Sequence, residues 1–134
     1  MKPCKGYYSL IQFCPDPSRA EAVNVGIVLF CPEAEFIAAR TARGNKRAAK
    51  LAGGKFNREE LNAAKRAIER RVEVDGEAFR TLDDLERFAN SRGNALRLTL
   101  PRPVKVFDPK ADLERLFDEL VGGRPLGKRS KVGE

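Results

Sequence analysis

Two dense apolar runs near the start of the chain, separated by a short polar loop, constrain the fold more than any other feature. The stretch 8–33 reads YSLIQFCPDPSRAEAVNVGIVLFCPE. Apolar residues occupy both parities of each run, which is typical of strands covered on both faces. The short connection favours an antiparallel hairpin. We therefore expect two central strands, at 7–14 and 22–31, and a third strand at 35–41.

The three cysteines bear on the register of this hairpin. Cys4, Cys14 and Cys31 are an odd set at irregular spacing, which does not indicate a disulfide framework. If Cys14 lies roughly opposite Ala22 or Val23, antiparallel pairing brings Cys31 close to Cys4. In that register the two thiols would be neighbours, but the sequence alone leaves the register open.

The chain contains no histidine. This removes the usual general base near neutral pH and excludes Ser-His-Asp and Cys-His catalysis within the chain. No CxxC pair is present, so a structural zinc site is not expected either. We predict no catalytic residue, no metal and no cofactor, and the sequence favours a protein that is not an enzyme.

Helix signals dominate the rest of the chain. A short helix is expected at 45–52, and a longer one after Asn57, where Glu60 completes a capping box. Another opens at Thr81, and the last is capped by Asp108 and begins at Pro109. Alternation at 95–100 predicts a strand that Pro101 interrupts and that 104–107 could extend.

These elements predict one α+β domain over residues 1–123. It would hold a small, mainly antiparallel sheet of about four strands with three or four helices packed on it. Residues 124–134, rich in glycine and basic side chains, are expected to form a disordered tail. No apolar run is long enough to span a membrane and no signal peptide is visible, so we expect a cytoplasmic protein without membrane contact.

Positive charge is concentrated in the middle of the chain. The formal net charge is +7, and residues 40–71 hold eleven Lys and Arg against three acids. No acid occurs from Phe36 to Arg58. Such a stretch could contact phosphate backbones, an acidic protein, or only solvent. The candidate patch consists of Arg40, Arg43, Lys46, Arg47, Lys50, Lys55 and Arg58.

A second candidate binding site is the polar loop between the first two strands. Its residues are Asp16, Ser18, Arg19 and Glu21, with Asn24 just inside the second strand. Arg19 could bind a carboxylate or phosphate with two hydrogen bonds, helped by Ser18 and Asn24. Alternatively, Asp16 and Ser18 make turn bonds and Arg19 pairs with Glu21 or Asp16, which is ordinary turn chemistry and the interpretation we favour.

Three segments resemble a known bacterial family. They are the block at 8–33, FIAAR at 36–40, and LRLTLPRPVKVFDPKADLERLFDELV at 96–121. In content and order they are similar to the family catalogued as domain of unknown function 3037 (DUF 3037). The resemblance brings no agreed activity or catalytic residue. It implies a protein partner, because family members resemble accessory proteins sometimes encoded beside toxin-type serine/threonine kinases.

Taken together, these patterns predict a bacterial, non-catalytic protein-interaction module. Its partner would be an unidentified protein, with a kinase of the toxin type as the suggested class. The alternative is a nucleic-acid-binding protein that uses the basic residues between Arg40 and Arg71. That binding would be insensitive to base sequence, because only Phe56 is near to stack on a base.

Overall fold

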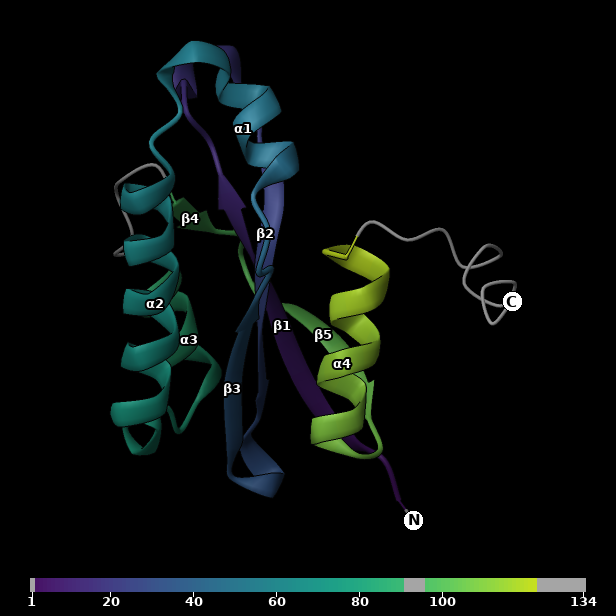
Figure 1. Cartoon of the computed structure of the whole chain (residues 1–134). Coiled ribbons are helices and arrows are strands. Elements are labelled where there is room, and N and C mark those ends of the chain that lie inside the picture. The colour runs from purple at the N-terminus through teal and green to yellow at the C-terminus, as the bar shows by residue number, and fades with distance from the viewer. Residues whose placement is uncertain (1, 91–95, 123–134) are drawn as a thin grey trace, which may run out of the picture.

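The computed structural model describes residues 2–90 and 96–122 and shows an α+β arrangement (Figure 1). Five strands form one antiparallel sheet: β1 (Cys4–Phe13), β2 (Val23–Cys31), β3 (Phe36–Thr41), β4 (Leu96–Leu98) and β5 (Arg102–Val106). The α-helices of the described residues are α1 (Lys46–Ala52), α2 (Arg58–Val74), α3 (Leu82–Asn90) and α4 (Pro109–Leu120). Short 3₁₀ turns are η1 (Pro17–Arg19), η2 (Pro32–Ala34), η3 (Gly53–Lys55) and η4 (Gly76–Ala78).

The β1–β2 hairpin is the centre of the sheet, as predicted. Tyr7 pairs with Phe30 and Phe13 with Val23, and a bulge between Ile11 and Gln12 shifts the register. Gly26 sits where the strands approach closely, since a Cβ there would lie 2.9 Å from the carbonyl oxygen of Arg40. A glycine is therefore required at this position if the third strand is to pack as it does.

The far edge of β1 is shared by two short strands. β5 pairs with Cys4–Tyr8, and β4 pairs with 11–13. Of the predicted strand at 95–100, Leu96–Leu98 form β4 and residue 95 lies outside the described residues. Pairing with β1 resumes at Arg102, beyond Pro101. Pro103 is tolerated in β5 because that strand pairs with β1 alone among the described strands.

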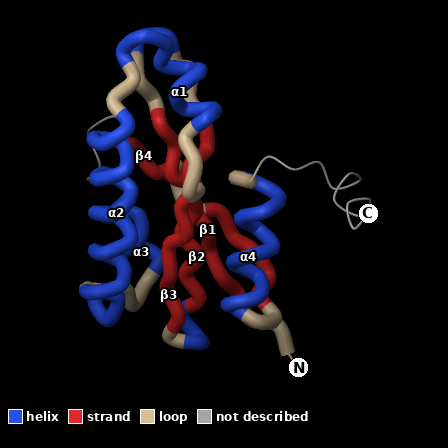
Figure 2. The backbone as a smooth tube through the Cα atoms, in the orientation of Figure 1, coloured by secondary structure: helices blue, strands red, loops and turns tan. Residues whose placement is uncertain are grey.

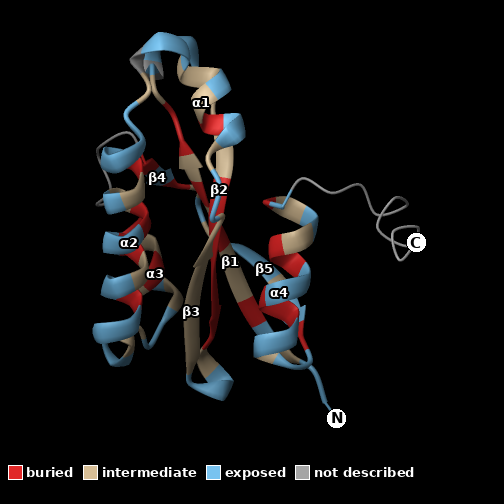
Figure 3. Ribbon diagram, viewed as in Figure 1, coloured by how far each residue is buried: buried red, intermediate tan, exposed pale blue. Residues whose placement is uncertain are grey.

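Helices cover both faces of the sheet, so the molecule has three layers (Figure 2). α1, α2 and α3 lie on one face, where Ile68, Leu85 and Phe88 pack on Val28 and Phe30. Among the described helices, α4 covers the other face, where its apolar residues Leu113, Leu116 and Phe117 pack with Ile27 and Leu29. Every residue of β2 from Val25 to Cys31 is buried, whichever face it points to, and β2 carries the buried colour in Figure 3. This confirms for β2 the prediction of a strand covered on both faces.

Helix starts are held by the caps that the sequence indicates. The side chain of Asn57 accepts a hydrogen bond from the Glu60 amide at 3.0 Å, and Asp108 caps α4. At α3 the Asp84 carboxylate accepts from the Thr81 amide at 2.9 Å, which completes a capping box. Among the described residues, no helix is both long and apolar enough to cross a membrane. The predicted tail, 124–134, lies outside the described residues.

Candidate functional site

The polar loop between β1 and β2 is held by bonds within itself. The carboxylate of Asp16 accepts from the amide of Ser18 at 3.1 Å and from its hydroxyl at 2.6 Å. The Arg19 guanidinium lies 3.3 Å from the Glu21 carboxylate. These are the turn bonds and the ion pair of the interpretation that we favour for this loop.

Asn24 makes different contacts from the other residues of the predicted loop site. Its side-chain amide donates to the carbonyl of Leu120 at 3.0 Å, and its oxygen accepts from Gln12 at 3.0 Å. Asn24 therefore connects the hairpin to the end of α4 and does not line the same surface as Arg19.

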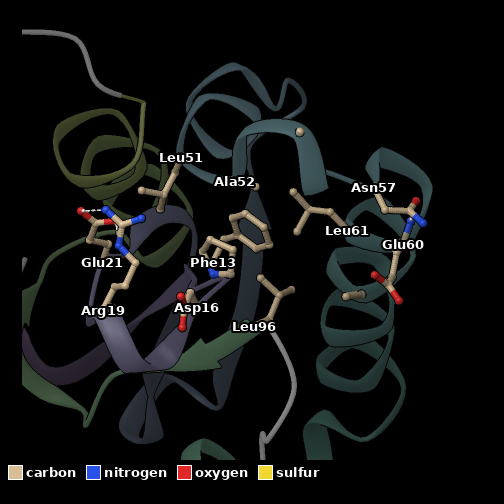
Figure 4. Close-up of a pocket in the computed structure, with 13 residues that line it drawn as sticks. Phe13, Asp16, Arg19, Glu21, Leu51, Ala52, Asn57, Glu60, Leu61 and Leu96 are labelled. Atoms are coloured by element: carbon tan, nitrogen blue, oxygen red, sulfur yellow. Dashed lines mark hydrogen bonds and ion pairs between the residues drawn. The ribbon is translucent and has the colours of Figure 1, made fainter.

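A groove of about 890 Å³ lies beside this loop. Its apolar residues come from four different elements: Phe13 from β1, Leu51 from α1, Leu61 from α2 and Leu96 from β4. Figure 4 shows these side chains in the middle of the groove. We call this hollow the α1–α2 groove.

Charged and polar groups line the sides of the α1–α2 groove. Asp16, Arg19 and Glu21 lie on the loop side, and Asn57 and Glu60 lie on the α2 side (Figure 4). Three of the predicted loop residues thus reach a common hollow, although Ser18 and Asn24 do not line it. The arrangement offers an apolar surface with polar groups around it, which is the usual composition of a binding pocket.

The predicted basic patch is divided by the fold. Arg40 forms an ion pair with Glu114, and its guanidinium lies 4.4 Å from the centre of the Phe117 ring. Arg47 donates to the carbonyl oxygens of Val121 and Asn24, the latter at 3.1 Å. Both side chains therefore hold α4 against the rest of the domain.

The remaining described members of the patch point to solvent. They make no ion pair with any other described residue. The side chain of Lys55, also a member of the patch, is not among the described side chains. The exposed cations are Arg43, Lys46, Lys50 and Arg58. Lys46 and Lys50 are one turn apart on α1 and share a face.

A buried lysine on α2 is not among the predicted site residues. Lys65 is 3% exposed, and its ammonium donates to the Ala42 carbonyl at 2.8 Å and to the Asn45 side chain at 2.5 Å. Burial lowers the pKa of Lys65 and the nearby Glu69 opposes the shift. The available signal was its position, since Lys65 falls on the same apolar stripe as Leu61 and Ile68.

Cys4 and Cys31 are neighbours, as they would be in the register considered from the sequence. Their sulfur atoms are 2.7 Å apart, and both are free thiols. Burial, together with the hydrogen bond to Cys4, raises the pKa of Cys31 to about 11. A thiol in this state is a poor nucleophile at neutral pH. Among the described residues, no group of three or more His, Cys, Asp or Glu could hold a metal ion.

The chain belongs to the family described as protein of unknown function (DUF3037), whose model matches residues 8–121. The match covers most of the chain and all of the strands and helices except the first part of β1. No curated protein and no solved structure matches the chain. The family resemblance found in the sequence is confirmed, and it assigns no activity.

Proposed function

We propose that this member of the DUF3037 family is a non-catalytic protein-interaction module and that the α1–α2 groove receives a segment of its partner. The observation that carries the proposal is the composition of the groove. Phe13, Leu51, Leu61 and Leu96 provide an apolar surface, and charged groups from the loop and from α2 surround it. Interfaces commonly combine an apolar centre with a polar rim in this way.

The state of the two buried cysteines also supports a binding role. The Cys31 thiol is buried with a raised pKa, and Cys14 is buried in the core. The chain contains no histidine that could activate either thiol. A surface that binds without chemistry is therefore the simplest use of the groove.

The partner that we propose is a toxin-type serine/threonine kinase of a bacterial cell. This choice rests on the family resemblance and not on the geometry of the groove. It predicts that the kinase is recovered when the tagged protein is purified from its native cell. The cytoplasm is the compartment in which we place both proteins.

The test is affinity purification from the native cell, with and without nuclease, using the wild type and Leu51→Glu. Leu51 is half-buried in the groove, so the substitution places a charge on its apolar surface. We expect the partner to survive nuclease treatment and to be lost with Leu51→Glu. The matched control is Lys110→Glu on α4, which is exposed and outside the groove. Recovery of the partner by Leu51→Glu at wild-type level would contradict the proposal.

A second candidate function is nucleic-acid binding, which one observation favours. Arg43, Lys46 and Lys50 are exposed and have no ion-pair partner among the described residues. Such cations can bind phosphates through charge alone, so affinity would fall steeply with salt. We expect reversal of these three charges to abolish any binding to a mixed-sequence DNA duplex. Arg47 is left unchanged in this variant because it hydrogen-bonds the end of α4. Strong preference for one sequence at physiological salt would contradict binding by charge alone.

A further inference from the structure

The third strand leaves one edge of the sheet open. β3 pairs with β2 and with no other strand of the described residues. It contains no proline and its pairing with β2 has no bulge, so two common forms of edge protection are missing. The two alanines at its centre carry small side chains that leave the backbone accessible. In Figure 1 β3 lies between α2 on its left and α4 on its right.

The hydrogen-bond pattern identifies which backbone groups are open. The Ala42 amide donates to Val25 of β2 at 2.8 Å, so Ala42 faces β2. Alternation along an antiparallel strand then turns Thr41, Ala39 and Ile37 away from β2. The Thr41 amide confirms this direction, because it donates to the Glu69 carboxylate at 3.1 Å. Ile37 and Ala39 are left with outward N–H and C=O groups.

A hollow follows the open part of this edge. A cavity of about 340 Å³ is lined by Ile37, Ala38 and Ala39 of β3 and by Glu69, Val72 and Glu73 of α2. Its lining is apolar on the β3 side, and two carboxylates lie on its α2 side. The Glu69 carboxylate also binds Thr41, whereas Glu73 is exposed.

We infer that β3 binds an extended segment of a protein partner by strand addition, and that this segment carries a basic residue. The segment would pair with the outward groups of Ile37 and Ala39, as in other complexes that add a strand to a sheet edge. Side chains alternate along a strand, so every second residue of the segment faces α2. A lysine or arginine at that position meets Glu69 and Glu73. The inference rests on the proposed function only in that the partner is a protein.

The probe is a synthetic peptide, TKVKVT with blocked ends, compared with TEVEVT. Amide hydrogen exchange by NMR is the readout. In the free protein the Ile37 and Ala39 amides should exchange faster than those of Ala38 and Arg40. Addition of TKVKVT should slow exchange at Ile37 and Ala39, and TEVEVT should have no such effect.

Two variants make the test specific. Ala39→Pro removes an outward amide that β2 does not use, so the sheet keeps its own bonds while the peptide loses one. Glu73→Lys keeps every backbone group of β3 and reverses the charge of one side chain in the cavity. We expect each to weaken TKVKVT binding about tenfold. Glu59→Lys is the matched control, because it makes the same charge change on α2 outside this cavity.

Three results would overturn the inference. One is binding of TKVKVT that leaves Ile37 and Ala39 unaffected. Another is equal binding of TEVEVT. The third is self-association that protects the same two amides without peptide, which would make a second copy of the chain the occupant. If Ala39→Pro and Glu73→Lys retain a native partner that Leu51→Glu loses, the proposed function stands and the strand-addition inference fails.

Discussion

The ammonium group of Lys65 on α2 lies 2.8 Å from the carbonyl oxygen of Ala42, just beyond β3. The same group also reaches the Gly44 carbonyl at 3.4 Å and the Asn45 side chain. One buried cation therefore donates hydrogen bonds to three acceptors of the loop that connects β3 to α1. These bonds hold the loop that leads into α1, whose Leu51 and Ala52 line the α1–α2 groove.

We predict that Lys65→Met destabilises the domain by roughly 1.5–3 kcal/mol, the usual value of hydrogen bonds to a charged group. Methionine preserves most of the side-chain volume but leaves the loop carbonyls without a donor. Urea unfolding measures the change. Arg66→Met is the control, because Arg66 is the exposed neighbour on the same helix. Equal stability of the two variants would contradict the role assigned to Lys65.

Alkaline pH should destabilise the protein through Cys31. Its pKa is about 11 in the fold, against an ordinary value of 9.0. Above pH 9 the Cys31 thiol of the unfolded chain loses its proton, whereas the folded protein still keeps it. The contribution of Cys31 to folding stability is therefore complete below pH 9 and is lost as the pH rises through the folded pKa. The slope can reach about 1.4 kcal/mol per pH unit.

The comparison for Cys31 is with Cys31→Val, which removes the titration and keeps an apolar side chain. Chemical unfolding at pH 8, 9 and 10 should show a steeper loss for the wild type. Parallel pH profiles would show that Cys31 does not titrate as described.

Acid should weaken the start of α3 through Asp84. The backbone amides of Arg80 and Thr81 donate to this carboxylate and lower its pKa below 3.8. The stabilisation is therefore present above pH 3.8 and is lost as pH falls through the folded pKa. Melting temperatures of the wild type and Asp84→Asn should differ near pH 6, and the difference should shrink as the pH falls below 3.8. A difference that persists undiminished at pH 3 would contradict the assignment.

Docking of α4 on the sheet should depend on Leu116. This side chain is 5% exposed in the cluster that includes Ile27 and Leu29 of β2. We predict that Leu116→Ala costs about 2–5 kcal/mol, as is typical of large-to-small changes in a core. Calorimetry would measure the change, with the exposed Lys110→Ala on the same helix as control. A shift no larger than that of the control would show that α4 does not dock as described.

Arg47 should stabilise the domain although its side chain is exposed. It bonds the carbonyls of Val121 and Asn24 and so joins α1 to the end of α4. We predict that Arg47→Ala costs roughly 1–3 kcal/mol. Lys46→Ala is the matched control on the neighbouring exposed position. If both substitutions leave the urea midpoint unchanged, Arg47 belongs with the solvent-exposed cations of the patch.

Local patterns in the sequence determined most of the elements and their caps. The hairpin follows from apolar residues on both strand parities, and its antiparallel pairing brings Cys31 towards Cys4. Asn57 and Asp108 mark helix starts because their side chains bond amides three residues away. Each of these interactions either lies within a few residues or follows from regular pairing, so the sequence pattern is enough to predict it.

Tertiary structure alone decided which side chains meet across the domain. Arg40 and Arg47 belong to one basic run in the sequence, yet the fold places them against α4 and leaves Arg43 and Lys50 exposed. The α1–α2 groove joins Phe13 to Leu96, and Lys65 joins α2 to the loop after β3. These contacts connect segments far apart in the chain. Their geometry depends on how helices dock on the sheet, which local periodicity does not specify.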